Sequence, residues 1–288
     1  MNHNPIFVKL KIRAAELGIS VKALGSVYVA EQLALYIAES EDTKDFLLCN
    51  FFSIGTDSVK GNGRITLIYR IEDTGYRELA ELTYALKRTL KGYDKPVVWT
   101  WRSEKSGREF QFHFDCGIGN MHIPVDMILM PTLGKVTYRT YHIRLLLENS
   151  QEKDIKILPA DHSVVEYTFE IMDRLIFLDD MNLFLEYYIL LSECDLTGSD
   201  ISRKFKAAAA TRGKEIRPRE LELLKNLRTD RQMRNKWRAF SKQTGRTDLT
   251  WEEVFDRIMK FLAPIWNALS EDDFFLGDWM CEIGRFLD

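Results

Sequence analysis

The spacing of apolar residues changes twice along this chain of 288 residues, and those changes limit the folds open to it. The first forty residues repeat apolar side chains at helical intervals. From about residue 46 to residue 147 the pattern is that of short strands, and from Ser163 onward it is helical again. Helices, then strands, then helices predict an α+β protein: two N-terminal helices, a mixed sheet and a C-terminal helical bundle. With 45% hydrophobic residues, the chain is long enough for two domains.

The first helix has clear boundaries in the sequence. Asn4 can cap it, and Pro5 suits its first turn because no N–H is needed there. We predict that it ends at Leu17, before Gly18. A second helix is predicted from Ser20 to about Glu39.

The middle of the chain predicts a sheet. Short segments rich in aromatic or β-branched residues, bounded by Gly, Asp or Asn, read as strands. These segments are Phe46 to Ile54, Arg64 to Ile71, Pro96 to Arg102, Glu109 to Cys116, His122 to Met130 and Val136 to Leu147. One helix, from Tyr76 to Leu90, is predicted among them.

A polar stretch from Glu148 to Asp154 interrupts the pattern. We therefore predict two domains, residues 1–155 and 156–288. In the second, Thr250 and Glu253 form a capping box that starts an amphipathic helix. Pro264 is predicted to kink or end that helix.

Composition excludes some classes of protein. The net charge of −3 indicates no particular partner. No N-terminal segment has the pattern of a signal peptide, and no apolar run is long enough to cross a membrane. The four cysteines are far apart in sequence, so we expect reduced thiols. Together these features predict a soluble cytoplasmic protein with no membrane partner.

Several short motifs occur in an order that points to a known family. The N-terminal ones run from Ile12 to Ser20 and continue at Tyr28, Glu31 and the segment from Asp45 to Leu48. The C-terminal ones are Glu170, Asp173-Arg174, Lys204-Phe205, Arg212, Trp237, Phe240, Asp248 to Val254 and Phe261 to Pro264. Over nearly its whole length the chain thus resembles the AbiEii/AbiGii toxin family. That resemblance implies a nucleotidyltransferase fold, nucleotide transfer to tRNA or protein, and a bacterial phage-defence or toxin–antitoxin setting.

The first two reactive motifs of that family are altered here. A Lys-Gly-Gly turn, whose bare backbone lets phosphate approach, corresponds to Cys49, Asn50 and Phe51. An Asp-x-Asp strand that would hold Mg²⁺ corresponds to Arg64 and Thr66. Neither residue can replace an anionic metal ligand.

The remaining motifs keep only isolated acids. The third carboxylate falls on Ile128, or on Asp126 after a shift of two residues. The family's Ala-Glu-Lys triplet keeps Glu170 but has Ile171 in place of lysine, and its Arg-Asp-x-x-Asp pattern keeps only Glu186. We therefore expect a degenerate enzyme with no cofactor; Mg²⁺ and a nucleoside triphosphate would be needed only if the chain were active.

Charge is uneven in the helical half. Residues 201–246 hold 15 Lys/Arg and 4 Asp/Glu, whereas residues 247–288 hold 3 and 10. The basic segment predicts either binding to a polyanion or pairing with the acidic segment. The candidate RNA- or partner-binding residues are Arg203, Lys204, Lys206, Arg212, Lys214, Arg234, Lys236 and Arg238.

Three hypotheses remain open. The first is a degenerate AbiEii-like protein that binds RNA, such as tRNA, or a cognate protein such as an antitoxin. The second is an active Mg²⁺-dependent transferase with relocated acids, using Asp126 with Glu170 or Glu72. The third is an assembly module that docks through the apolar tail from Phe274 to Leu287, for which packing onto the chain's own bundle is the alternative.

Other groupings are weaker. His113, Asp115, Cys116 and His122 lack the regular spacing of a zinc site, so a structural role is favoured. Trp99 and Trp101 share a strand face, where packing is favoured over base stacking. Gly25-Ser26 with Asp42 and Asp45 could be a displaced Gly-Ser…Asp motif, but it begins inside a helix. Glu72 and Asp73 are predicted to be turn residues.

Overall fold

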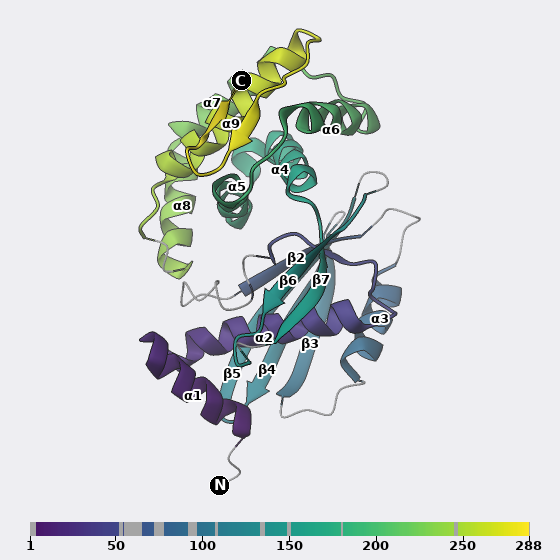
Figure 1. Ribbon diagram of the computed structural model, residues 1–288, viewed down its shortest axis with the longest axis vertical. Helices are drawn as coiled ribbons and strands as arrows, with labels where there is room; N and C mark the ends of the chain where they lie inside the picture. The colour runs from purple at the N-terminus through teal and green to yellow at the C-terminus, as the bar shows by residue number, and fades with distance from the viewer. Residues whose placement is uncertain are drawn as a thin grey trace. The chain divides into compact units, whose positions relative to one another are not determined.

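The chain divides into two compact units, residues 1–158 and 159–288, in the computed structural model (Figure 1). The ranges that the structure describes are 4–51, 54, 65–71, 78–91, 97–106, 109–132, 136–148, 151–179, 181–244 and 247–287. Arg64, Glu72 and Asp73, on which some predictions depend, lie outside them. The fold is α+β, as predicted: a mixed sheet preceded by helices, and then a mainly helical unit.

The first unit is built on a seven-stranded sheet with the order β3-β4-β5-β2-β1-β7-β6. The β2–β5 and β1–β7 pairs are parallel, and the other pairs are antiparallel. The strands are β1 (Leu47–Leu48), β2 (Ile65–Ile71), β3 (Val97–Ser106), β4 (Glu109–Ile118), β5 (Met121–Pro131), β6 (Arg139–Arg144) and β7 (Glu152–Ile157). The helices are α1 (Pro5–Leu17), α2 (Val21–Glu39) and α3 (Leu79–Lys91).

The N-terminal helices begin and end as predicted. The Asn4 carboxamide accepts the N–H groups of Ile6 and Phe7, and Gly18 ends α1 with a φ of 67°. Ser20 caps α2, which crosses one face of the sheet (Figure 1). A Cβ atom on Gly25 would come within 2.7 Å of the Ile123 side chain. Gly25 thus allows close packing of α2 on β5, and it lies inside the helix as predicted.

Three strand predictions need correction. In the region expected to be a strand from Phe46 to Ile54, the structure shows the strand Leu47–Leu48. Beyond it, the side chain of Asn50 makes the hydrogen bonds to β2 that strand backbone would make, as described below. The strand expected from Val136 to Leu147 is shorter, Arg139–Arg144. The polar break predicted at Glu148–Asp154 is wrong, since β7 begins at Glu152. Only Ile155 and Ile157 of β7 are buried. The strand is otherwise made of charged residues, so its sequence lacks the apolar alternation expected of a strand.

A buried acid joins α2 to the end of the sheet. Glu31 is only 1% exposed, and its Oε2 atom accepts the N–H of Leu146 at 2.9 Å. Burial raises its pKa from 4.5 to about 7, although the Leu146 hydrogen bond acts in the opposite direction. The carboxylate form is therefore disfavoured in the folded protein.

Replacing Glu31 with glutamine should stabilise the protein at high pH. The unfolded chain loses the Glu31 proton first, so this group lowers the stability of the native chain as pH rises from 4.5 to about 7. A glutamine side chain does not titrate and can still accept the Leu146 N–H. The advantage of Glu31→Gln in free energy of unfolding should be near zero below pH 4.5 and on the order of 3 kcal/mol at pH 8.

Urea unfolding at several pH values measures this difference. Glu39→Gln is the matched control, because Glu39 lies on the same helix but is exposed and bonds Lys153 at the surface. If the native and Glu31→Gln proteins kept a constant difference from pH 4.5 to pH 8, the buried-acid account would be wrong.

The second unit is a helical bundle with a small C-terminal hairpin. Its helices are α4 (Ala160–Arg174), α5 (Asn182–Glu193), α6 (Gly198–Thr211), α7 (Pro218–Lys225), α8 (Arg231–Thr244) and α9 (Trp251–Ser270), with 3-10 turns η3 (Leu175–Phe177) and η4 (Asn226–Arg228). The hairpin strands are β8 (Asp278–Met280) and β9 (Arg285–Leu287). The helical pattern predicted from Ser163 onward extends to the end of α9 at Ser270, and the hairpin follows it.

Helix α9 forms the apolar centre of the second unit. Thr250 and Glu253 make the predicted capping box at its start. Pro264 does not end the helix, which continues to Ser270. Phe261 before the proline and Ile265 and Trp266 after it are all buried. Burial of this continuous stripe outweighs the hydrogen bond that proline removes.

Candidate functional site

A row of polar residues crosses four strands on the sheet face opposite α2. Residues Arg102, His113, Asp126 and Thr66 are in register on β3, β4, β5 and β2; we call them the polar row. Strand alternation places the neighbours Phe112, Phe114, Val125 and Met127 on the other face, where they are buried. The polar row contains Thr66 and Asp126, two of the positions that the sequence singled out, and the register brings them side by side.

His113 connects two carboxylates in this region. Its Nδ1 atom lies 2.6 Å from Asp126 Oδ1, and its Nε2 atom lies 3.2 Å from Glu104 Oε1. The His113 and Asp126 side chains are mostly buried, with exposed fractions of 20% and 17%, whereas Glu104 is exposed at 58%. A neutral imidazole has one N–H and can donate to only one acid, while imidazolium can donate to both. A carboxylate has no proton to donate, so Asp126 is the acceptor in this contact when Nδ1 of His113 carries the proton.

Asn50 takes the place of backbone in the sheet. Its Nδ2 atom donates to the Thr66 carbonyl at 2.6 Å, and its Oδ1 atom accepts the Ile68 N–H at 2.8 Å. The side chain is buried, so both groups of β2 would otherwise lack a partner. Where the resemblance implies a glycine turn open to phosphate, this chain has an amide fixed in the sheet.

The neighbouring positions are apolar and packed. The Phe51 ring lies 4.7 Å from that of Tyr141 and is buried. Cys49 and Ile68 belong to a hydrophobic cluster against which Ile128 packs. Ile128 therefore contributes to packing at the position where the resemblance implies a carboxylate.

The described residues include no group of three or more His, Cys, Asp or Glu side chains placed to hold a metal ion. The candidate zinc set does not converge, because Cys116 is buried on the α2 face while Asp115 and His122 pair at the surface. No two of the four cysteines form a disulfide. The sequence reasoning missed Glu104, whose contact with His113 follows from the β3–β4 register and not from spacing along the chain.

The other predicted acids lie in the second unit. Glu170 on α4 pairs with Arg174 at 3.5 Å, and the neighbouring Ile171 is buried. Glu186 on α5 is buried in the bundle, with an exposed fraction of 3%. Each acid lies on a helix of the bundle, and Ile171 forms part of its core.

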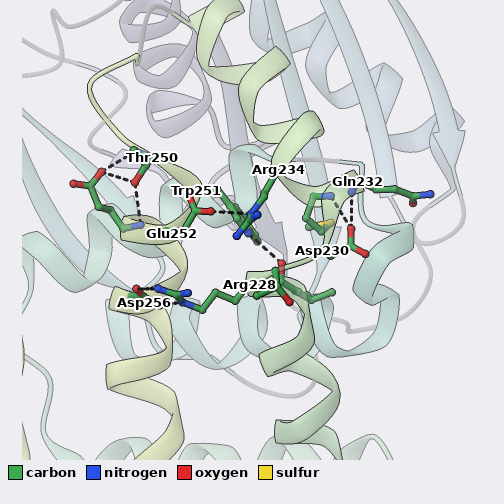
Figure 2. Close-up of polar contacts among 12 residues, drawn as sticks. Arg228, Asp230, Gln232, Arg234, Thr250, Trp251, Glu252 and Asp256 are labelled. Carbon is green, nitrogen blue, oxygen red and sulfur yellow. Dashed lines mark hydrogen bonds and ion pairs between the residues drawn. The ribbon is translucent and has the colours of Figure 1, made fainter.

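Most of the predicted basic residues are engaged inside the second unit. Seven of the eight form ion pairs: Arg203–Asp200, Lys204–Asp161, Lys206–Asp272, Arg212–Glu166, Lys214–Asp173, Arg234–Glu252 and Lys236–Asp179. Two of those acids, Glu252 and Asp272, come from the acidic C-terminal segment. Arg228–Asp256 links the same two segments, and Figure 2 shows this pair beside Arg234–Glu252. Three of these eight pairs therefore link the basic segment to the acidic segment, and the other five use acids from elsewhere in the second unit.

The aromatic groups pack inside their own units. Trp101 lies 5.9 Å from Phe112 and 5.6 Å from Phe114 between ring centroids, so sheet-face packing is confirmed. Trp279 in the tail is fully buried against Phe261 and Phe286. Among the tail's apolar residues, Phe274, Leu276, Ile283 and Leu287 remain exposed.

Comparisons with known proteins give a likeness of fold alone. No protein-family model matches the sequence, and no curated protein matches it. One similar solved structure is described as "Crystal structure of JHP933 from Helicobacter pylori", with a TM-score of 0.49, 8% identity and coverage of 88% of this chain and 94% of that one. Another is described as "Crystal structure of putative nucleotidyltransferase from H. pylori", with a TM-score of 0.39, 9% identity and coverage of 89% and 100%. None of the described helices is long and apolar enough to span a lipid bilayer.

Proposed function

We propose that this chain is an AbiEii-like protein that has lost metal-dependent nucleotide transfer and acts by binding a protein partner in a bacterial phage-defence or toxin–antitoxin-type system. The observation that carries the proposal is the contact between Asp126 and His113 at 2.6 Å. Asp126 is the acid in register with Thr66, at the expected metal position on β2 and β5. A two-metal site needs several carboxylate ligands. Here one acid bonds a histidine, and the neighbouring position on β2 is a threonine, so the ligands for two metal ions are lacking at these positions.

Internal pairing of the basic segment favours a protein partner over RNA. Binding to nucleic acid depends on cations that can neutralise phosphates. Seven of the eight candidate cations already have a carboxylate partner in the same unit. To bind RNA, these residues would have to exchange their carboxylate partners for phosphates. The number of ion pairs would then hardly rise, so the gain in binding free energy would be small.

A labelled-nucleotide transfer assay tests the loss of chemistry. The full chain is incubated with Mg²⁺, each labelled nucleoside triphosphate, total bacterial RNA and a bacterial protein extract. We expect no incorporation above the level without the protein. Incorporation that requires Mg²⁺ and disappears in Asp126→Asn would establish the active-transferase hypothesis instead. Asp115→Asn is the control, because Asp115 is an acid on the adjacent strand that pairs with His122.

RNA binding is tested separately by titrating labelled tRNA at several salt concentrations. We expect weak binding that does not change between the native chain and a chain carrying Arg203→Gln and Arg212→Gln. If the chain bound tRNA tightly and the affinity fell steeply with salt, the proposed partner would be RNA and not a protein.

A further inference from the structure

An open pocket of about 410 Å³ lies between α8 and the N-terminal end of α9. Its volume is within the range of sites for small molecules, roughly 300–1,000 Å³. The residues that matter for its chemistry are Arg234, Trp237, Arg238, Lys242, Thr250 and Glu252. All of them belong to the second unit, outside the polar row.

The pocket has an excess of positive charge. Arg234, Arg238 and Lys242 are spaced by four residues on α8, so they lie along one face of that helix. Glu252 neutralises Arg234, with its Oε1 atom 2.8 Å from Arg234 Nε (Figure 2). For Arg238 and Lys242 the described part of the chain provides no ion pair. These two cations differ in this respect from the paired basic residues around them.

The end of α9 adds donors to the same pocket. The Thr250 hydroxyl accepts the N–H of Glu253, and the Glu253 carboxylate accepts the N–H of Thr250. This capping box leaves the N–H groups of Trp251 and Glu252 without an intrahelical acceptor. The first turn of a helix also carries partial positive charge, which favours an anion.

The walls of the pocket are held in place by internal contacts. Trp237 is buried, and its Nε1 donates to the Leu249 carbonyl at 3.0 Å. The neighbouring Trp251 donates to the Leu227 carbonyl at 3.1 Å. These bonds and the Arg234–Glu252 pair fix α8 against the start of α9. The helices that carry the site are therefore fixed, whereas the side chains of Arg238 and Lys242 are exposed and would become ordered when a ligand binds.

We propose that this pocket binds a small molecule carrying a phosphate group. A phosphomonoester has two negative charges and several oxygens, which match Arg238, Lys242 and the helix end together. A guanidinium can bond two phosphate oxygens at once. The neighbouring cations Arg228 and Arg234 are already paired with Asp256 and Glu252, which favours a compact phosphate ligand over a long polyanion.

Calorimetric titration of the full chain with AMP in the presence of EDTA tests the site. We expect saturable binding of AMP, weaker binding of inorganic phosphate and none of adenosine. The double variant Arg238→Gln, Lys242→Gln should weaken AMP binding by about tenfold or more, because two charged hydrogen-bond donors are lost. Arg231→Gln is the control, since Arg231 is an exposed cation on α8 outside the pocket, and it should leave the affinity unchanged.

Three results would overturn the proposal. They are no AMP binding at millimolar concentration, equal affinity in the double variant and the control, or binding of a 5′-phosphorylated RNA oligonucleotide without binding of AMP. The test contains no metal ion and alters residues of the second unit alone. Its outcome is therefore independent of whether the polar row supports nucleotide transfer.

Discussion

Trp279→Ala should lower the free energy of unfolding of the second unit by about 4 kcal/mol, in the range for removing a buried aromatic side chain. Trp279 is fully buried, and its Nε1 donates to the Leu191 carbonyl at 2.9 Å. The Phe261 and Phe286 rings pack against it at 5.4 Å and 5.2 Å. Alanine would leave a cavity among these groups, and the Leu191 carbonyl would lose one of its two donors, keeping the Arg257 guanidinium.

Chemical unfolding followed by tryptophan fluorescence and circular dichroism measures this change. Ile283→Ala is the control, because Ile283 lies in the same tail but is 53% exposed. It should change stability by less than about 0.5 kcal/mol. If Trp279→Ala left stability unchanged, the tail would not be part of the bundle's core, and the docking hypothesis would gain support.

Asn50→Leu should destabilise the first unit by about 4 kcal/mol, because two buried backbone groups lose their partners at about 1–3 kcal/mol each. The groups are the Thr66 carbonyl and the Ile68 N–H, which the Asn50 amide bonds at 2.6 Å and 2.8 Å. Leucine has a similar shape but can neither donate nor accept. The loss therefore reports hydrogen bonding more than packing.

Asn50→Asp separates the two bonds. Aspartate keeps an acceptor for the Ile68 N–H, but its ionised form cannot donate to Thr66 and would be buried as a charge. At low pH, where the carboxyl is protonated, its stability should fall between those of the native chain and Asn50→Leu. Denaturant unfolding of the three proteins under one set of conditions gives the ranking. A native-like stability for Asn50→Leu would mean that Asn50 does not hold β2, and the glycine-turn position would be open to another role.

Local signals in the sequence were sufficient where one residue determines the structure. Asn4 and Gly18 mark the ends of α1 because their side-chain and backbone chemistry acts within a few residues. Strand β7 was not predicted, because its charged residues interrupt the alternation of apolar and polar residues that marks a strand. It is held by pairing with β6 and β1, and the β1 partner lies far away in sequence. Pro264 does not end α9, because the residues on both sides of it are buried, which the sequence alone did not reveal.

The candidate site was predictable only in part. The sequence indicated that Thr66 and Asp126 belong together, and the β2–β5 register places them side by side. The partner of Asp126 could not be predicted, because the β4–β5 pairing brings His113 beside it and the β3–β4 pairing brings Glu104 to His113. The basic segment illustrates the same limit. Its composition fits both a polyanion site and internal pairing, and only the helix packing brings Glu252 to Arg234.

Binding of Mn²⁺, a substitute for Mg²⁺, tests the central claim most directly. Electron paramagnetic resonance measures free Mn²⁺ as the full chain is added together with ATP. We predict that the native chain and Asp126→Asn bind the same amount of Mn²⁺, because Asp126 serves as the acceptor for His113 in the sheet. A Mn²⁺ site present in the native chain and lost in Asp126→Asn would contradict the account and make Asp126 a metal ligand.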